Sequence, residues 1–244
     1  MATPVQLNNP FVRNSMLACL VMLAAATITC AGQLPDTGQT SCYNMTAATD
    51  CVADTGFPRQ DGSQVAAAGY TKLDAAGNDL DASAPSWSCV RDNATGLVWE
   101  VKTSDSGLRD AAHRYVWLSF DVGNGGVSGG AILADFCGGT IGTDCNTENY
   151  VSFVNGSNYC GANDWRLPTQ MELLTLVHAG NIRPAIDAGF FPNTASVPYW
   201  SSLTYAVNPL NAWGVHFGYG ATHAVPKSEP NAVRLVRGVW GQQP

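Results

Sequence analysis

Cysteine is the residue type with the clearest chemical consequence in this sequence. Eight cysteines occur, without a Cys-x-x-Cys pair or a Cys/His cluster at zinc-ligand spacing, so we expect no structural metal and no cofactor. Six follow the first 30 residues, an even number that favours three disulfides in an oxidising compartment. These candidates are Cys42, Cys51, Cys89, Cys137, Cys145 and Cys160. Sequence does not determine the connectivity. Our guess is local pairing of Cys42 with Cys51 and of Cys145 with Cys160, which leaves Cys89 with Cys137.

Two short motifs resemble catalytic or metal-binding sites. Gly126-Val127-Ser128-Gly129-Gly130 matches the nucleophile elbow of serine hydrolases. That elbow requires a rigid strand-to-helix turn, whereas this serine lies in the glycine-rich stretch 123–130, which we interpret as a loop. Glu229-Pro230-Asn231 copies a motif of calcium-dependent lectins, but one carboxylate and one amide are too few ligands for calcium. We therefore expect neither a serine nucleophile nor a calcium site.

The four histidines do not pair at metal-ligand spacing; they are His113, His178, His216 and His223. His178 falls in a predicted helix, where we expect a partly buried, hydrogen-bonding role. His216 is expected to point outward beside Tyr219. Both side chains can stack on a sugar ring or anchor a protein partner.

The composition excludes several functional classes. Of the 244 residues, 45% are hydrophobic and 13% are charged, against about 25% charged in typical soluble domains. The hydrophobic fraction is too high for a disordered chain and too scattered for a multi-span membrane protein. The net charge is −7, which argues against broad nucleic-acid binding because that binding requires Lys and Arg against phosphates.

The N-terminus predicts export. Arg13 precedes an apolar run over 16–28, which is shorter than the roughly 20 residues that span a bilayer. We interpret 1–30 as a secretory signal peptide. Cys30 is a candidate for lipidation, and simple cleavage near Ala31 is the alternative. The predicted location is the bacterial periplasm, outer membrane or cell surface, with membrane contact only through such an N-terminal lipid anchor.

The rest of the chain divides into a small N-terminal segment, 31–86, and a main domain, 87–240. In the main domain we expect helices over 107–117, with Ser106 as N-cap, and over 146–154, with its two ends clamped by a Cys145–Cys160 disulfide. Thr169 and Glu172 form the pattern of a capping box, which predicts a helix over 170–179 that contains His178.

Strands are expected over 97–101, 199–202, 212–217 and 233–236. Along 212–217, alternation places Trp213, Val215 and Phe217 inward, and Gly214, His216 and Gly218 outward. In the last strand Val233 and Leu235 should face inward. A few helices followed by several strands favour an α+β fold over repeated βαβ units.

An ordered set of motifs resembles the collagen-like adhesin (Lcl) C-terminal domain family. The similarity spans about 87–240, and each motif is weak alone while the ordered set is specific. The matching segments are Thr95-Gly96-Leu97-Val98-Trp99, Cys160-Gly161-Ala162-Asn163-Asp164-Trp165-Arg166-Leu167-Pro168-Thr169, Glu172-Leu173-Leu174, Tyr199-Trp200-Ser201-Ser202, Ala212-Trp213 with Phe217, and Val233-Arg234-Leu235-Val236-Arg237-Gly238.

The resemblance implies a disulfide-bonded, C-type-lectin-like domain with irregular loops, similar to formylglycine-generating enzymes. It also implies surface display and capture of a glycan or surface protein, with homo-oligomerisation as a further expectation. Glycosaminoglycan binding, a trait of the typifying adhesin domain, is not expected to be charge-driven here because no Lys/Arg cluster exists. The family-matching arginines are expected to pair with buried carboxylates such as Asp164 or Glu172; they are Arg166, Arg234 and Arg237.

Some lectin-fold proteins of this type are diversified by retroelements in the stretch before the last strand, which corresponds to 205–231 here. We therefore predict that ligands bind the 199–231 strand and loop face, because loops on rigid scaffolds carry function. The predicted contacts are Tyr205, Val207, Asn208, Leu210, Asn211, Gly214, His216, Tyr219 and His223. Three alternatives stay open: a retroelement-diversified receptor-binding protein, a passive self-assembling envelope component, and an enzyme of the formylglycine-generating type. The enzyme would need a reactive, reducible cysteine pair facing a pocket.

Overall fold

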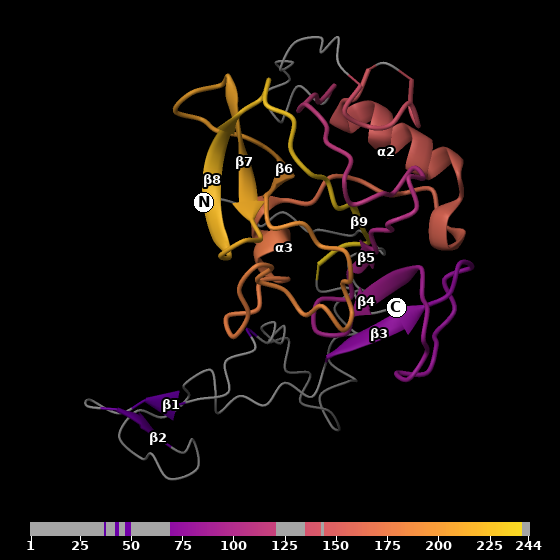
Figure 1. Cartoon of the computed structure of the whole chain (residues 1–244), viewed down its shortest axis with the longest axis vertical. Coiled ribbons are helices and arrows are strands. Elements are labelled where there is room, and N and C mark those ends of the chain that lie inside the picture. Colours follow the sequence, from indigo (N-terminus) through magenta and orange to yellow (C-terminus); the bar gives the residue numbers. More distant parts are fainter. Residues whose placement is uncertain are drawn as a thin grey trace, which may run out of the picture. The chain divides into compact units, whose positions relative to one another are not determined.

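The computed structural model describes residues 37, 42–43, 47–49, 69–120, 135–142 and 144–240 (Figure 1). These residues all belong to one compact unit, Gln33–Pro244. The predicted signal peptide with Cys30, most of the segment 31–86 and the glycine-rich stretch 123–130 lie outside the described residues. Within the described part, every helix is too short or too polar to cross a membrane.

The described strands form three antiparallel sheets. The first is the short pair β1 (Cys42–Tyr43) and β2 (Ala48–Thr49). The second has the order β3-β4-β5-β9 and the third the order β6-β7-β8. The strands of the second are β3 (Tyr70–Leu73), β4 (Cys89–Asp92), β5 (Val98–Glu100) and β9 (Val236–Arg237); those of the third are β6 (Pro198–Thr204), β7 (Asn211–His216) and β8 (Ala221–Pro226). The expected mixture of α and β structure is confirmed, whereas the C-type-lectin-like identity stays a prediction.

Two of the three expected helices are present. Helix α2 (Thr147–Gly156) begins after Asn146, whose side chain accepts a hydrogen bond from the Asn149 amide. Helix α3 (Gln170–Leu174) carries the predicted capping box of Thr169 and Glu172. A 3-10 turn, η3 (Tyr159–Gly161), lies between them.

Helix α3 is shorter than predicted. After Leu174, the amides of Leu176 and Val177 bond to the carbonyls three residues earlier, which tightens the chain into turns. The amide of His178 then bonds to the Ala185 carbonyl instead of continuing a helix. His178 therefore lies outside the helix in which we expected it.

The predicted helix over 107–117 is wrong, because aspartate side chains take the backbone donors of this segment. The Asp110 carboxylate accepts from the amides of Ser106 and Ala112, and Asp105 accepts from Gly107. Such local bonds compete with helical ones. Ser106, the expected N-cap, has a φ of +58°.

One face of the three-stranded sheet is buried at the end near the β7–β8 turn, and the opposite face is buried at the other end. Near the β7–β8 turn, the cross-strand pair Tyr199 and Val215 is fully buried in one core cluster. Toward the β6–β7 loop, the cross-strand pair Ala212 and Val225 is buried in the other. Residues three apart in a strand point to opposite faces, so Ala212 and Val215 bury opposite faces.

This geometry corrects three predicted orientations, one of them that of Gly218, which we expected outside and which is buried. Trp213 shares a face with Val215 but lies beyond that core and is only half-buried, although we expected it inside. Gly214, which we expected outside, is buried, and a Cβ there would lie 2.9 Å from the Tyr199 carbonyl oxygen. Val215 and Phe217 are buried as predicted, and His216 is half-exposed.

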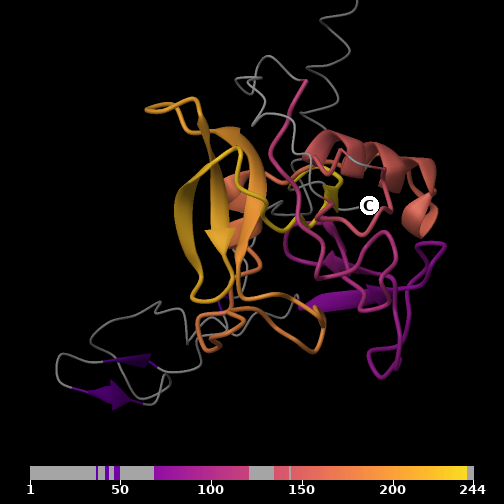
Figure 2. The same ribbon diagram turned by 45° about the horizontal axis from the view of Figure 1, so that its top comes forward.

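The C-terminal segment 232–236 connects the two larger sheets. Ala232 bridges Tyr199 of β6, and Val236 pairs with Trp99 of β5. Val233 and Leu235 are buried as predicted, but Arg234 and Val236 are buried as well. The segment contributes to both core clusters, so strict in-and-out alternation does not apply to it. Figures 1 and 2 show β6–β8 on one side of this segment and β3–β5 with α2 on the other.

The two described disulfides contradict two of the three guessed bonds, Cys145–Cys160 and Cys89–Cys137, while the guessed Cys42–Cys51 bond stays a prediction because Cys51 lies outside the described residues. Cys89 bonds to Cys160, and Cys137 bonds to Cys145. Cys42 is also disulfide-bonded, and its partner lies outside the described residues. The Cys145–Cys160 clamp on α2 is therefore absent, because Cys145 reaches back to the preceding loop while Cys160 fastens η3 to β4.

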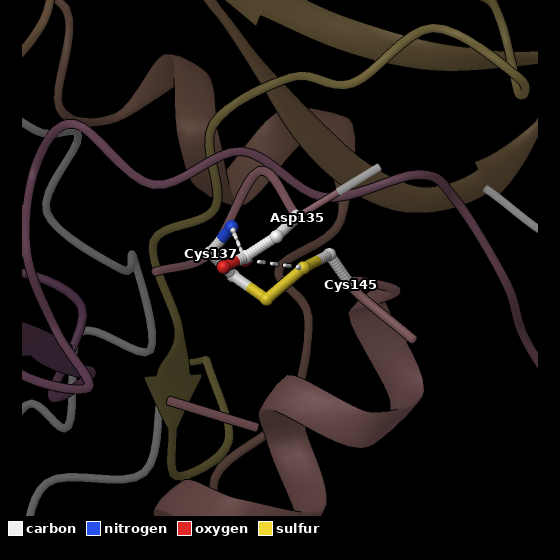
Figure 3. A group of neighbouring side chains, drawn as sticks. All are labelled: Asp135, Cys137 and Cys145. Atoms are coloured by element: carbon white, nitrogen blue, oxygen red, sulfur yellow. Dashed lines mark hydrogen bonds between the residues drawn. A yellow bond between two sulfur atoms is a disulfide. The ribbon is translucent and has the colours of Figure 1, made fainter. Parts of the chain in front are cut away.

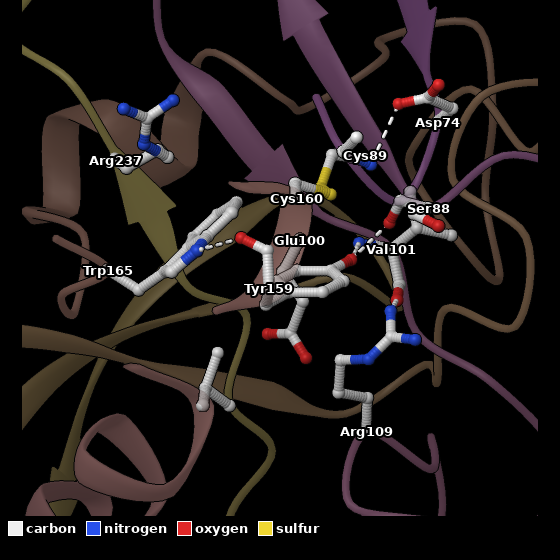
Figure 4. The surroundings of a disulfide bond; sticks show 12 residues. Asp74, Ser88, Cys89, Glu100, Val101, Arg109, Tyr159, Cys160, Trp165 and Arg237 are labelled. Atoms are coloured by element: carbon white, nitrogen blue, oxygen red, sulfur yellow. Dashed lines mark hydrogen bonds between the residues drawn. A yellow bond between two sulfur atoms is a disulfide. The ribbon is translucent and has the colours of Figure 1, made fainter. Parts of the chain in front are cut away.

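The aromatic side chains of Tyr159 and Trp165 lie near the Cys89–Cys160 bond (Figure 4). The Tyr159 hydroxyl donates to the carbonyl of Ser88, beside Cys89. The indole of Trp165 donates to the Tyr159 carbonyl at 2.9 Å. The bond thus fixes the family-matching segment that begins at Cys160 onto the four-stranded sheet.

The three arginines have different partners. Arg166 forms the expected bidentate pair with Glu172, at 2.7 and 2.8 Å. Arg237 bonds to Asp164 at 2.6 Å near the surface. Arg234 corrects the prediction, since it is fully buried and donates to the Glu100 carbonyl and the Thr194 hydroxyl instead of a carboxylate.

Candidate ligand-binding site

The structure separates the nine predicted contact residues into two groups at opposite ends of the β6–β8 sheet. Tyr205, Val207, Asn208, Leu210 and Asn211 lie in or beside the β6–β7 loop, and His216, Tyr219 and His223 lie at the β7–β8 turn. Gly214 lies between them and is buried. Asn211 and His216 mark the two ends of β7, a separation of roughly 16 Å at 3.3 Å per strand residue. Figure 2 shows the loop and the turn at the two ends of the sheet.

At the β7–β8 turn, three side chains form what we call the histidine–tyrosine cluster: His216, Tyr219 and His223. The rings of His216 and Tyr219 stack, with centroids 4.2 Å apart and an interplanar angle of 21°. The Tyr219 hydroxyl and the Nε2 atom of His223 are 2.7 Å apart, within hydrogen-bond distance. Tyr219 is nevertheless 55% exposed. The cluster is an accessible aromatic surface whose geometry is fixed before any ligand arrives.

Two glycines in the turn permit this arrangement. The amides of Tyr219 and Gly220 both bond to the His216 carbonyl, and Gly220 has a φ of +73°, which other residues rarely adopt. The Gly218 amide donates to Nδ1 of His216 at 2.9 Å. A Cβ on Gly218 would lie only 2.7 Å from Cε1 of that ring. The turn thus packs directly against the imidazole.

The hydrogen bond to Gly218 determines the proton arrangement of His216. Because Nδ1 accepts, the neutral ring carries its proton on Nε2 and can donate it. Partial burial, followed by the charge of His223, lowers the pKa of His216 from its ordinary value of 6.5. At neutral pH His216 therefore offers an uncharged aromatic face with an N–H donor at its edge.

At the β6–β7 end, three of the predicted contacts and one residue of β7 form what we call the loop cluster. Its members are Tyr205, Val207, Leu210 and Trp213. The rings of Tyr205 and Trp213 meet edge to face, with centroids 4.9 Å apart. Val207 is 81% exposed and Leu210 is 66% exposed. The predicted contact Asn208 uses its side-chain oxygen within the loop, where it accepts from the Leu210 amide at 3.1 Å.

Sequence reasoning missed Trp213 as a surface residue. We assigned it to the scaffold from strand alternation alone. Its neighbours Ala212 and Gly214 are both small, which suits the face in close contact with another layer. That pattern was the available signal that the tryptophan faces the other way.

One group of metal-ligating residue types occurs among the described residues: Asp135, Cys137 and Cys145 (Figure 3). The two sulfurs are joined in a disulfide, so no thiolate is available to bind a metal. The Asp135 carboxylate already accepts from the amides of Cys137 and Gly139 at 3.0 Å. This group stabilises a loop and gives no support to a metal centre.

The enzyme alternative requires a reactive cysteine pair that faces a pocket. The four cysteines of the two described disulfides are buried. None of them lines the pocket of about 350 Å³ that α2, the segment before α3, and β6 form. These four residues therefore give the enzyme alternative no support.

Comparison with known proteins agrees with the motif resemblance. A search of the curated proteins finds none that matches this chain. The family model of the Lcl C-terminal domain matches residues 88–237, which is more than half of the 244 residues. The match begins beside Cys89 of β4 and ends with Arg237 of β9, so it contains both candidate contact clusters and all buried residues of the two core clusters except Leu73 of β3. The chain therefore belongs to the Lcl C-terminal domain family.

Proposed function

We propose that this protein is an exported, adhesin-type protein that captures a glycan or a surface protein without covalent chemistry, and that the histidine–tyrosine cluster makes the central contact. Membership of the Lcl C-terminal domain family supports an adhesin-like role. The observation that carries the location is Tyr219, which is 55% exposed although its ring is stacked and its hydroxyl lies 2.7 Å from Nε2 of His223. An exposed side chain that is already ordered loses little conformational entropy when it binds.

The chemistry of the cluster favours a glycan over a protein. Aromatic rings pack against the apolar face of a sugar, while the polar edges of Tyr and His bond to its hydroxyls. The Nε2–H of His216 is a donor for a sugar oxygen, since its Nδ1 accepts from Gly218. The cluster contains no lysine or arginine that would attract a sulfate group, so neutral glycans suit it better than sulfated ones.

The test is a binding screen of residues 33–244, expressed in an oxidising compartment, against a glycan array and a panel of host and microbial surface proteins. The chain, the double variant His216→Ala/Tyr219→Ala and the control Val207→Ser/Leu210→Ser are compared. We expect selective binding that the first variant loses and the control retains. Loss only in the control would move the site to the loop cluster. The absence of any hit from the folded chain would contradict the adhesin role.

Export is proposed together with this function. The basic start and short apolar run of the sequence support a signal peptide, and the two described disulfides support an oxidising compartment. Mass spectrometry of the mature protein from its host tests this. We expect a new N-terminus near Ala31, or a diacylated Cys30. An intact Met1 with free thiols would contradict export.

A further inference from the structure

A pocket of about 350 Å³ lies away from the histidine–tyrosine cluster, where α2 and the segment leading into α3 meet β6. Its size falls in the range of small-molecule sites. We call it the α2 pocket. The lining residues used below are Glu148, Val151, Arg166, Leu167 and Ser202. It shares no residue with either contact cluster.

The polar rim of the α2 pocket retains hydrogen-bonding capacity. Oε1 of Glu148 accepts from the Phe120 amide at 2.8 Å, while Oε2 bonds to none of the described residues. The Ser202 hydroxyl likewise bonds to none of them, although its amide donates to Pro168. One carboxylate oxygen and one hydroxyl are therefore available across the pocket.

The remaining walls are rigid and partly apolar. Val151 and Leu167 are half-buried and pack against a core cluster. Arg166 is held by both oxygens of Glu172 and by the Gly238 carbonyl. The Arg166–Glu172 pair is neutral as a whole, so Glu148 leaves the pocket with net negative charge.

We propose that the α2 pocket binds one neutral pyranose residue. Val151 and Leu167 provide an apolar surface for the C–H face of the ring, and Glu148 and Ser202 bond to its hydroxyls. The carboxylate of Glu148 disfavours sugars that carry carboxylate or sulfate groups, because like charges repel in a confined site. This proposal does not depend on the proposed function of the histidine–tyrosine cluster, and the two are tested independently.

The test records backbone amide shifts of residues 33–244 by NMR during titration with three neutral methyl hexosides, the α-methyl glycosides of glucose, galactose and mannose. Methyl glucuronoside serves as the acidic probe. We expect at least one hexoside to shift the amides of Val151, Leu167 and Ser202, and the glucuronoside to bind about tenfold more weakly. No shift at these amides with any hexoside, or equal binding of the acidic sugar, would overturn the proposal.

Variants separate the pocket from general surface effects. Val151→Phe fills the pocket and should abolish the shifts, whereas Ser152→Phe places the same ring at the exposed neighbouring position of α2 and should preserve them. Glu148→Gln can keep the bond from Phe120 while removing the charge, so the penalty on the glucuronoside should disappear with the fold intact. Unchanged hexoside binding in Val151→Phe, or an unchanged penalty in Glu148→Gln, would contradict the assignment. His216→Ala/Tyr219→Ala should leave these shifts unaffected.

Discussion

At the scale of single residues, the candidate site depends on how one imidazole is held. His216 stacks on Tyr219, accepts from the Gly218 amide and lies near His223. Each contact suits the neutral ring. Protonation of Nδ1 would remove the acceptor that Gly218 uses. The His216 ring is therefore ordered and uncharged in the same range of pH.

The first prediction concerns the pKa of His216, which partial burial and the neighbouring His223 lower from 6.5. Because the folded state disfavours the cation, the contribution of His216 to stability is fully present above its unfolded-state pKa. It is lost as the pH falls through the lower, folded-state pKa. An NMR titration of the imidazole signals should give a midpoint for His216 below that of the urea-unfolded chain. A folded-state midpoint equal to or above the unfolded one would contradict this environment.

The second prediction is that Gly218→Ala damages the cluster. The new Cβ would lie 2.7 Å from Cε1 of His216 and 3.3 Å from the Ser196 carbonyl oxygen. Overpacking of this kind costs about 1–3 kcal/mol, and it should displace the His216 ring. The control is Gly156→Ala at the end of α2, where a Cβ meets nothing within 4 Å. Denaturant midpoints should fall for the first variant only. Equal midpoints for the two variants would show that the turn does not pack against the ring.

At the scale of elements, the two described disulfides differ in the length of chain that they close. Cys89–Cys160 joins residues 71 apart and fastens η3 to β4, whereas Cys137–Cys145 joins residues 8 apart within one loop. A longer closed loop removes more entropy from the unfolded chain. The first bond should therefore matter more for stability than the second.

The third prediction follows from this difference. In the chain-entropy estimate, replacement of Cys89 and Cys160 by serine costs about 4 kcal/mol, and the same change at Cys137 and Cys145 costs about 2.5 kcal/mol. Urea unfolding of the two double variants gives the comparison. A larger loss for the Cys137/Cys145 variant would mean that its loop stabilises the domain by more than chain closure.

The elements also show what sequence can and cannot predict. The Thr169–Glu172 capping box is a local pattern and was predicted, and the start of α2 was predicted within one residue, although Asn146 was not recognised as its N-cap. The orientation of Trp213 was not predicted correctly. Strand alternation shows which residues share a face, but it does not show which face is buried at each end of the strand. The pairing of Cys89 with Cys160 was equally inaccessible, since it depends on how distant elements meet. The predicted contact face divided into two clusters for the same reason.

At the scale of the whole molecule, a buried ionic network lies where the C-terminal segment meets β5. The Glu100 carboxylate is fully buried and accepts from Lys102, from the Tyr150 hydroxyl and from the Leu235 amide. Arg234 donates to the Glu100 carbonyl at 2.5 Å. Burial lowers the pKa of Lys102, and the Glu100 charge opposes that shift. Glu100 is thus the anion that accompanies two buried basic side chains.

The fourth prediction is that Glu100→Gln destabilises the domain strongly. Removal of one partner from a buried ion pair typically costs about 3–5 kcal/mol, because the other charge is left without compensation. Addition of Lys102→Met should recover part of this loss, and Glu229→Gln at the exposed surface should change little. Free energies of unfolding from urea titrations test the set. If Glu100→Gln were as mild as Glu229→Gln, the network would not stabilise the junction between the sheets.

The central claim is that ligands contact the histidine–tyrosine cluster, and the four histidines of the chain allow a direct test. The imidazole C–H signals of the folded domain, labelled with ¹³C-histidine, are recorded before and after addition of the glycan or protein found in the screen. Binding at the cluster should shift the signals of His216 and His223 and leave those of His113 and His178 unchanged. Saturated binding with His216 and His223 unchanged would contradict the account.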